Sequence, residues 1–241
     1  FFITAILYSS VGFGGGSTYL ALLLIWNVPY YIFPVIALLC NIIVVSGNSF
    51  NYVKAGHHNF KLLIPFLIGS IPLAFLGGTL IIDKEIFEIL LFLVLTVAGL
   101  LLLIKNKSYE EKVVKINIPH LFISLLIGST LGLISGIVGI GGGIFLSPIL
   151  FLLKADKPKN IITTASLFIL INSISGLMGQ LTKENILNEI LLYYPLFISV
   201  FIGGLLGNFL NLKIFSNRLL ALTTSLLVIF VAIRMGLKIF I

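Results

Sequence analysis

The sequence predicts an all-α integral membrane protein built from two homologous halves of four apolar segments each. The chain has 241 residues, of which 59% are hydrophobic and 10% are charged, whereas a soluble domain carries about 25% charged residues. Apolar runs reach roughly 20 residues, the length at which a helix spans a bilayer. These continuous runs lack the alternation of a transmembrane β-barrel. We therefore expect membrane-spanning helices, and a glycine-rich motif that occurs twice indicates a duplication.

The apolar segments form two repeats on either side of a polar linker. We expect the first repeat at 1–104, the linker at 105–118 and the second repeat at 119–241. The segments lie at 1–26, 32–53, 61–82, 86–104, 119–153, 161–181, 190–211 and 219–240. A run long enough to cross the membrane precedes Gly139, but only 11 residues precede its counterpart Gly12. We therefore expect a few residues to precede Phe1 in the natural protein.

The duplication is carried mainly by the two glycine motifs. "GFGGG" at 12–16 matches "GIGGG" at 139–143, and each interrupts an apolar run. Further matches follow in the same order: Pro29 with Pro158, Ser46-Gly47 with Ser175-Gly176, and Phe75-Leu-Gly-Gly78 with Phe201-Ile-Gly-Gly204. Glycine pairs recur by chance in membrane helices, so these further matches add support and do not establish the repeat alone.

Two topologies are compatible with these segments. If all eight cross the membrane, the lysines and arginines divide nine against six between the two sides. If 1–26 and 119–153 instead enter and leave on the same side, the division is eleven against four. The positive-inside rule favours the second topology. It gives three crossings per half, so the halves would be inverted repeats with broken helices, as in many secondary transporters.

The glycine motifs predict breaks in two helices. Consecutive glycines allow the backbone to leave the helix and to approach a solute closely. The helix that restarts after them presents unpaired N–H groups and the positive end of its dipole, which together bind anions. The alternative is close helix packing, although packing glycines are usually spaced by three residues between them. Consecutive glycines favour the broken-helix interpretation.

The carboxylates and the polar side chains narrow the type of solute. All eight Asp and Glu residues lie in loops or at segment ends, whereas a proton relay or cation site usually places an acid in mid-span. Polar residues instead line 32–53 and 161–181, among them Asn48, Asn172 and Ser175. They would donate to an oxyanion, or alternatively form hydrogen bonds between helices. The predicted substrate-binding residues are Gly14, Gly15, Gly16, Ser17, Asn48, Gly141, Gly142, Gly143, Asn172 and Ser175.

Composition and motifs argue against several other classes. The net charge of +7 reflects loop lysines and not a nucleic-acid surface. His57, His58 and His120 have no cysteine or carboxylate at ligand spacing, so we expect no metal site. Cys40 is the single cysteine and excludes an intrachain disulfide. Arg234 would either reach the membrane interface or act as a countercharge. No catalytic triad, nucleotide-binding loop or HExxH motif occurs, so we expect neither an enzyme nor a cofactor.

Three stretches resemble the TauE/SafE sulfite exporter family: "GIVGIGGGIFLSPILFLL" at 136–153, its copy at 12–25, and "NYVKAGHHNFKLLIPFLIGSIPLAFLGGTL" at 51–80. The resemblance implies a multi-pass permease of the cell membrane for sulfite, a sulfonate, sulfoacetate or another organic anion. Its partners would be the anion, the bilayer and a proton or sodium ion as coupling ion, and a homo-oligomer is compatible with it.

The first copy departs from the family pattern. Ala21 stands where the second copy has Pro148, and Ser17-Thr18 replaces Ile144-Phe145. We therefore expect the first break to be the more polar half of the site. An anion channel, a membrane scaffold and a transporter of an unrelated small solute remain as alternatives.

Overall fold

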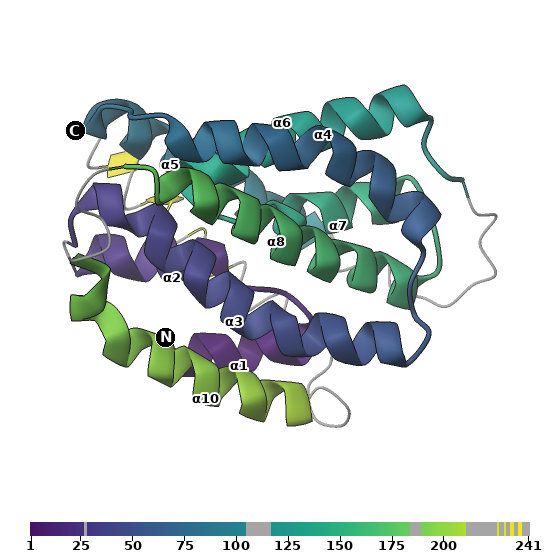
Figure 1. Cartoon of the computed structure of the whole chain (residues 1–241), viewed down its shortest axis with the longest axis horizontal. Coiled ribbons are helices and arrows are strands. Elements are labelled where there is room, and N and C mark those ends of the chain that lie inside the picture. Colours follow the sequence, from purple (N-terminus) through teal and green to yellow (C-terminus); the bar gives the residue numbers. More distant parts are fainter. Residues whose placement is uncertain are drawn as a thin grey trace.

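The computed structural model describes residues 1–26, 28–104 and 117–183, then 189–210 and six positions between 226 and 237. Every regular element in this part of the chain is a helix (Figure 1). In chain order the α-helices are α1 (Phe2–Val11), α2 (Gly16–Ile25), α3 (Phe33–Lys54), α4 (Phe60–Thr79), α5 (Lys84–Ile104), α6 (Leu121–Val138), α7 (Gly143–Leu152), α8 (Pro158–Gln180) and α10 (Tyr194–Leu210). Short 3-10 helices at Tyr30–Ile32 and Leu191–Tyr193 precede α3 and α10.

Local signals in the sequence set the helix ends. The side chain of Asn59 accepts a hydrogen bond of 3.2 Å from the amide of Leu62 and caps α4, as asparagine does at helix N-termini. Proline occupies the first turn of α3 and of α8, where its missing N–H costs nothing. The predicted segment 119–153 is divided into α6 and α7, and 1–26 into α1 and α2, at the glycine motifs.

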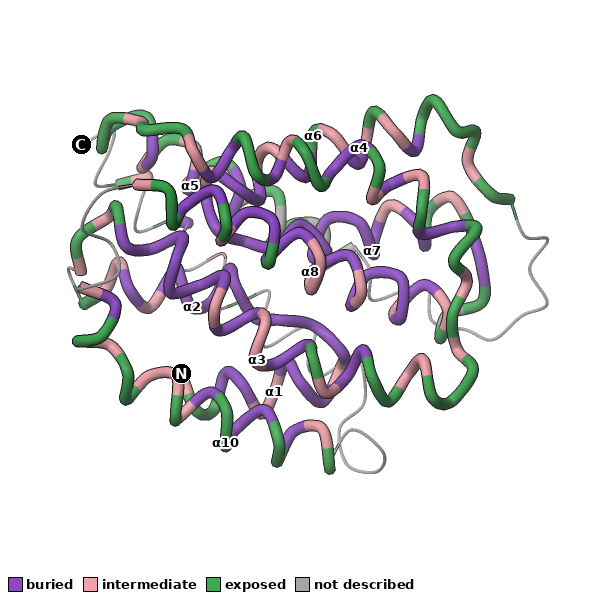
Figure 2. The backbone as a smooth tube through the Cα atoms, in the orientation of Figure 1, coloured by how far each residue is buried: buried purple, intermediate pink, exposed green. Residues whose placement is uncertain are grey.

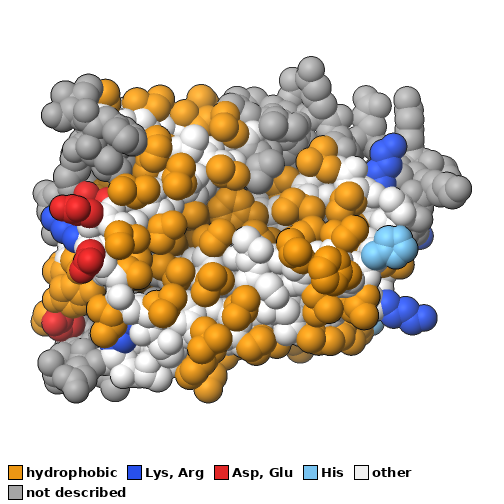
Figure 3. Space-filling model, turned by 90° about the horizontal axis from the view of Figure 1, so that it is seen from above, with side chains coloured by type: hydrophobic (Ala, Val, Ile, Leu, Met, Phe, Trp, Pro, Cys, Tyr) orange, Lys and Arg blue, Asp and Glu red, His pale blue; other side chains and the backbone are white. Residues whose placement is uncertain are grey.

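Five helical segments are long and apolar enough to cross a membrane, so the chain is a multi-pass membrane protein as predicted. They are Tyr30–Lys54, Phe60–Thr79, Leu121–Val138, Lys159–Gln180 and Leu191–Leu210. Figure 2 shows buried backbone concentrated in α3, α8 and the short helices α2 and α7, whereas α10 is largely exposed. Large apolar side chains cover the outer surface between the two ends (Figure 3), which is the surface that lipid solvates.

Each broken pair begins and ends at one end of the bundle. The ring of Phe1, before α1, stacks on Trp26, after α2, with 6.1 Å between centroids. The amide of Asn117, before α6, donates to the carbonyl of Lys154, after α7, at 3.1 Å. The re-entrant topology predicts this return for both pairs. Eight plain crossings would place the loops around 59 and 156 on opposite sides of the membrane, yet Asn59 Nδ2 donates to Asp156 Oδ2 at 2.6 Å.

The two ends differ in charge, as Figure 3 shows. One end carries the loops after α3 and α7 and the start of α6, with Lys54, His57, His58, Lys61, His120, Lys154, Asp156, Lys157 and Lys159. The opposite end carries Asp83, Lys84, Glu85, Glu88, Lys183 and Glu189. There the hydroxyl of Tyr31 donates to Glu189 at 2.7 Å. The positive-inside rule predicts that the lysine-rich end faces the cytoplasm.

Helices of one predicted repeat pack against helices of the other. The helix α4 packs on α6, and α10 packs on α1. Both contacts are so close that a methyl group added at Gly128 would collide with the carbonyl oxygen of Phe66, and one at Gly207 with that of Ile6. Thus the third apolar segment of each repeat lies against the first helix of the other. The inverted-repeat relation itself stays a prediction, because most of the last segment, 219–240, lies outside the described residues.

Candidate functional site

The first glycine motif forms a break between α1 and α2. Gly12 ends α1 with φ 82°, and Gly15 precedes α2 with φ 86°, both in the left-handed region that favours glycine. The amides of Thr18 and Tyr19 donate to the carbonyl of Gly15 at 3.0 Å. Helical bonding therefore begins at Thr18, and the amides of Gly16 and Ser17 stand at the positive end of α2.

The second motif repeats this backbone geometry between α6 and α7. Gly139 ends α6 with φ 88°, and Gly142 precedes α7 with φ 72°. The amides of Phe145 and Leu146 donate to the carbonyl of Gly142 at 3.1 and 3.2 Å. One difference separates the copies, because Gly141 has φ 82° whereas Gly14 has no left-handed φ.

The two breaks meet, and Asn41 of α3 lies between them. A methyl group built on Gly16 would lie 2.8 Å from the carbonyl oxygen of Ile140 in the second break and 2.8 Å from Asn41 Nδ2. One built on Gly141 would also lie 2.8 Å from Asn41 Nδ2. Asn41 is 0% exposed, and neither its Nδ2 nor its Oδ1 finds a hydrogen-bond partner among the described residues.

Other buried polar atoms on α2, α3, α6 and α8 also have no partner within the described part of the chain. They are the hydroxyls of Ser17, Tyr19, Ser135, Thr164 and Ser173, both amide atoms of Asn48, and Oδ1 of Asn172. The Ser173 hydroxyl is 3.1 Å from a methyl group built on Gly141. Leaving a buried polar group unpaired costs about 1–3 kcal/mol, so several together indicate a place where a polar ligand completes the hydrogen bonds.

The surroundings of the two breaks differ in polarity. Gly14 and Gly16 lie against the amide of Asn41, and the Tyr8 hydroxyl is 2.7 Å from Thr18 Oγ1 across the first break. In the second break Gly141 also lies against Asn41 Nδ2 and the Ser173 hydroxyl, whereas Gly142 and Gly143 lie against apolar side chains of α8. A methyl group on Gly143 would collide with Ile169, and one on Gly142 would lie 2.9 Å from the ring of Phe168. Both breaks thus share the contact with Asn41, and the expectation that the first break is the more polar stays a prediction.

Not all of the predicted site residues reach the breaks. Asn172 donates to the carbonyl of Phe168 at 3.0 Å and keeps Oδ1 unpartnered in the described structure. Ser175 donates to the carbonyl of Ile71 at 2.7 Å, which joins α8 to α4. Ser173, two residues earlier, is the serine that lies beside Gly141. A substrate-binding role of Ser175 stays a prediction.

Two residues of the site region belong to the predicted polar stripes but were not among the predicted substrate-binding residues. Asn41 belongs to the polar stripe of 32–53, and its place seven residues before Asn48 puts both on one helical face. Gln180 donates from Nε2 to the carbonyl of Gly136 at 2.7 Å, near the end of α6 where helical carbonyls lack partners. Gln180 belongs to the polar stripe of 161–181, for which hydrogen bonds between helices are the alternative role, but the sequence does not indicate its partner on α6.

Charged groups lie away from the breaks in the described structure. The described Asp, Glu, Lys and His residues all sit at helix ends or in loops, and Arg234 lies outside the described residues. The amine of Lys183 donates to Gln180 Oε1 at 2.8 Å, and burial lowers the pKa of Lys183 to about 8. The described chain holds no group of three or more His, Cys, Asp and Glu side chains placed for a metal.

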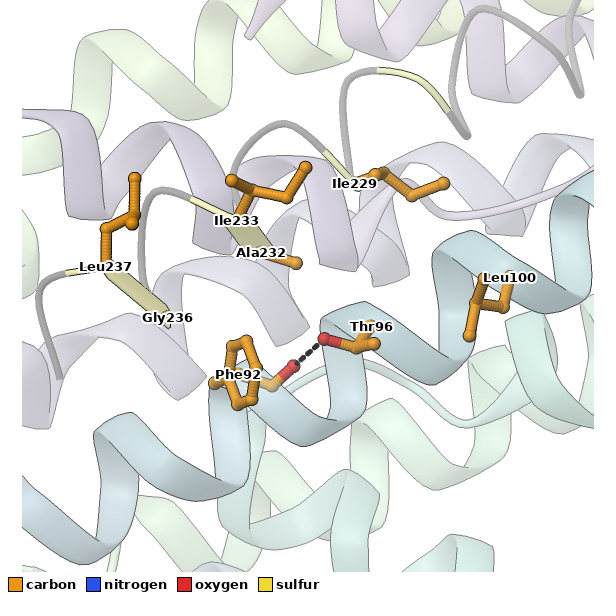
Figure 4. A pocket seen from close by; sticks show the side chains of 8 residues that line it. All are labelled: Phe92, Thr96, Leu100, Ile229, Ala232, Ile233, Gly236 and Leu237. Carbon is orange, nitrogen blue, oxygen red and sulfur yellow. Dashed lines mark hydrogen bonds between the residues drawn. The ribbon is translucent and has the colours of Figure 1, made fainter. Parts of the chain in front are cut away.

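A separate apolar cavity lies at the outside of the bundle. Its volume is about 410 Å³, and it is lined by Phe92, Thr96 and Leu100 of α5 and by residues between 229 and 237 (Figure 4). Thr96 Oγ1 donates to the carbonyl of Phe92 at 2.8 Å, so this hydroxyl is already bonded within the helix. The lining suits an acyl chain or another apolar group better than a small anion.

Comparisons with known proteins agree on one family of transporters. A family model described as "Sulfite exporter TauE/SafE" matches residues 1–235. A probable membrane transporter protein of Sinorhizobium fredii is 26% identical over 94% of this chain and 92% of its own length. One of Methanocaldococcus jannaschii is 29% identical over 76% and 70%, and one of Bacillus subtilis is 21% identical over 92% and 89%. No solved structure matches the chain.

Proposed function

The chain belongs to the TauE/SafE sulfite exporter family of membrane proteins, and from this premise we propose that it is a secondary transporter of a small sulfur-containing or organic anion. Sulfite, a sulfonate and sulfoacetate represent this class. The anion binds where the two glycine breaks meet, and no enzymatic step is involved.

The observation that carries the proposal is the buried amide of Asn41 between the two breaks. Two helices begin there with their positive ends, α2 at Gly16 and α7 at Gly143. Asn41 is completely buried with both amide atoms unpartnered among the described residues. Hydrogen-bond donors without a neighbouring carboxylate favour an anion over a cation. The absence of a described acid at this depth also argues against a carboxylate-based cation pump.

Apolar residues close the site in this structure. Tyr8, Phe13 and Val45 pack with Ala165 and Ile169 beside the first break, and Ser17 is 1% exposed. A substrate enters only when these contacts open. Because α10 packs on α1 and α4 packs on α6, a movement of one half would carry the broken pair of the other half with it. Such rocking of one half against the other gives alternating access in secondary transporters.

The proposal is tested by transport of labelled sulfite into proteoliposomes. We expect saturable flux that responds to the gradient of an unlabelled anion on the opposite side. The variant Gly142→Leu should lose this flux for two reasons. A Cβ atom there would lie 2.9 Å from the ring of Phe168, and the leucine backbone would have to adopt an unfavourable φ of 72°. Gly56→Leu is the matched control, because Gly56 has φ 76° with nothing within 4 Å of a methyl group.

The outcomes separate the alternatives. Unchanged transport by correctly folded Gly142→Leu would contradict the proposed site. Flux that does not saturate would indicate an anion channel. Saturable flux of another solute that sulfite and sulfonates do not inhibit would indicate a different substrate class.

A further inference from the structure

We propose that Asn41 selects the charge state of the transported anion, so that the site accepts a monovalent oxyanion that still carries a hydrogen-bond donor and rejects a dianion. This inference rests on the proposed function and narrows the substrate of the same site to an anion such as hydrogen sulfite. A simple sulfonate, which has no hydroxyl donor, would bind more weakly, and sulfoacetate, a dianion at neutral pH, would be rejected. Two independent features support it, namely the hydrogen-bonding character of the Asn41 amide and the lack of a described cation beside it.

The first feature is that the amide presents both a donor and an acceptor to the site. Asn41 Nδ2 and Oδ1 are both buried without a partner in the described structure. The N–H groups of Gly16 and Ser17 at the start of α2 add donors alone. The NH₂ group of Asn41 joins them in binding an anionic oxygen, but its carbonyl oxygen needs a donor from the ligand.

A dianion leaves this carbonyl without a partner. A fully deprotonated oxyanion has acceptors alone, so one of its oxygens would face Asn41 Oδ1, and the two oxygens would repel each other. A monoanion that keeps one hydroxyl presents an anionic oxygen to the donors and the hydroxyl to Oδ1. A site with buried polar groups on both sides discriminates strongly against a ligand that leaves one of them unpaired.

The second feature is that the described elements around Asn41 carry no formal charge there. The titratable side chains around the first break are Tyr8 of α1 and Tyr19 of α2, which lie beside Gly15, and Tyr52 of α3, which lies beside Gly12. Cys40 precedes Asn41 in α3, and all four groups are uncharged near neutral pH. The helices α6, α7 and α10 contain no Asp, Glu, Lys, Arg or His, and in α8 the lysine Lys159 lies in the first turn. The negative charge of a bound anion is therefore stabilised by neutral dipoles.

Neutral dipoles favour a single negative charge. The cost of transferring an ion from water to a medium of low dielectric constant rises with the square of its charge, so a dianion costs about four times as much as a monoanion of the same size. Twice the charge gains only about twice the interaction with fixed dipoles. Without a cation beside the site, the desolvation cost of a dianion outweighs its gain from the dipoles, and binding of the monoanion is favoured.

The experiment compares three anions in proteoliposomes that contain the full chain: sulfite, which changes from monoanion to dianion near neutral pH, sulfate, which stays a dianion, and methanesulfonate, which stays a monoanion. We expect sulfite flux, divided by methanesulfonate flux at the same pH, to fall about tenfold per pH unit above the sulfite pKa, as the monoanion fraction does. Sulfate should not compete. The vesicle interior should acidify as imported monoanion releases its proton, which an enclosed pH dye reports.

Variants at one position separate selection from a structural role. Asn41→Leu removes Oδ1 and the NH₂ group, and we expect it to reduce the preference of sulfite monoanion over methanesulfonate as well as the flux. Asn41→Ser keeps a donor and an acceptor and should keep more of that preference. Asn51→Ala is the matched control, because Asn51 is exposed on the same helix and donates to Asn208 at 3.1 Å.

Three results would overturn the inference while leaving the proposed function intact. They are sulfite flux that follows the dianion, competition by sulfate as strong as that by methanesulfonate, and a loss in Asn41→Leu that is equal for all anions. A folded wild-type protein that transports none of the three anions would instead overturn the proposed function, and this inference with it.

Discussion

A single methyl group at Gly16 should separate the two glycine breaks. Gly16 does not have a left-handed φ, so alanine adds no backbone strain. Its methyl group would lie 2.8 Å from the carbonyl oxygen of Ile140 and 2.8 Å from Asn41 Nδ2, whereas ordinary contacts are 3.4–4 Å. The backbone oxygen cannot rotate away, so the breaks must move apart by roughly half an ångström or more. Overpacking of this kind costs about 1–3 kcal/mol.

We expect this energy to appear as weaker binding of the anion, because the hydrogen-bond donors of the site move apart. An energy of 1–3 kcal/mol corresponds to an affinity about 5- to 150-fold weaker, measured as the KM of anion uptake by Gly16→Ala. Thermal unfolding in detergent reports any loss of stability. The control is Gly204→Ala in α10, whose methyl group would lie 3.6 Å from Val44 Cα. It should leave KM unchanged and stabilise the helix by up to about 1 kcal/mol. A Gly16→Ala protein with the KM and stability of the wild type would refute the reasoning.

Three further predictions concern contacts outside the breaks. Gln180→Leu should lower the free energy of unfolding by about 1–3 kcal/mol, because it removes the 2.7 Å bond to Gly136 and leaves that buried carbonyl unpaired; chemical denaturation measures this. Burial lowers the pKa of Lys183 from 10.5 to about 8, so the unfolded chain binds more protons between these values. Stability should therefore rise with pH from 8 to 10.5, and Lys183→Met should abolish that rise. In a background without the native cysteine, new cysteines at Lys84 and Lys157 should react with an impermeant reagent from opposite sides of the membrane, whereas labelling of both from one side would contradict the re-entrant topology.

The sequence was sufficient to predict the broken helices and their return to one side. Consecutive glycines disfavour a continuous helix and permit the left-handed φ of a break. The positions of lysines record the topology because charged loops resist crossing the bilayer. In the structure each broken pair begins and ends at the same end of the bundle, as the contact of Phe1 with Trp26 shows for the first pair.

The identity of the donor between the breaks could not be predicted from the sequence. The polar residues of 32–53 were recognised as a stripe, but which of them meets a glycine depends on the rotation and depth of α3 against α2. The structure places Asn41 there. On α8 a shift of two residues separates Ser173, beside Gly141, from Ser175, which bonds to α4. Because helical side chains two residues apart point in different directions, pattern alone could not decide between them.

The packing between the repeats was likewise outside the reach of the sequence. The glycines at 128, 132 and 136 follow the spacing of packing motifs, but the motif does not name the partner helix. The structure shows that α6 packs on α4, from the other repeat. This exchange links the first helix of each broken pair to a helix of the other half, so we expect that pair to follow a movement of the other half.

A structure of the protein determined with sulfite or a sulfonate bound tests the central claim most directly. The account predicts the anion between 14–17 and 141–143, with one oxygen bonded to the amides at the start of α2 and to Asn41 Nδ2. An anion bound elsewhere, for example among the lysines and histidines of the charged end or in the apolar cavity beside α5, with the two breaks and Asn41 still closed on each other, would contradict it.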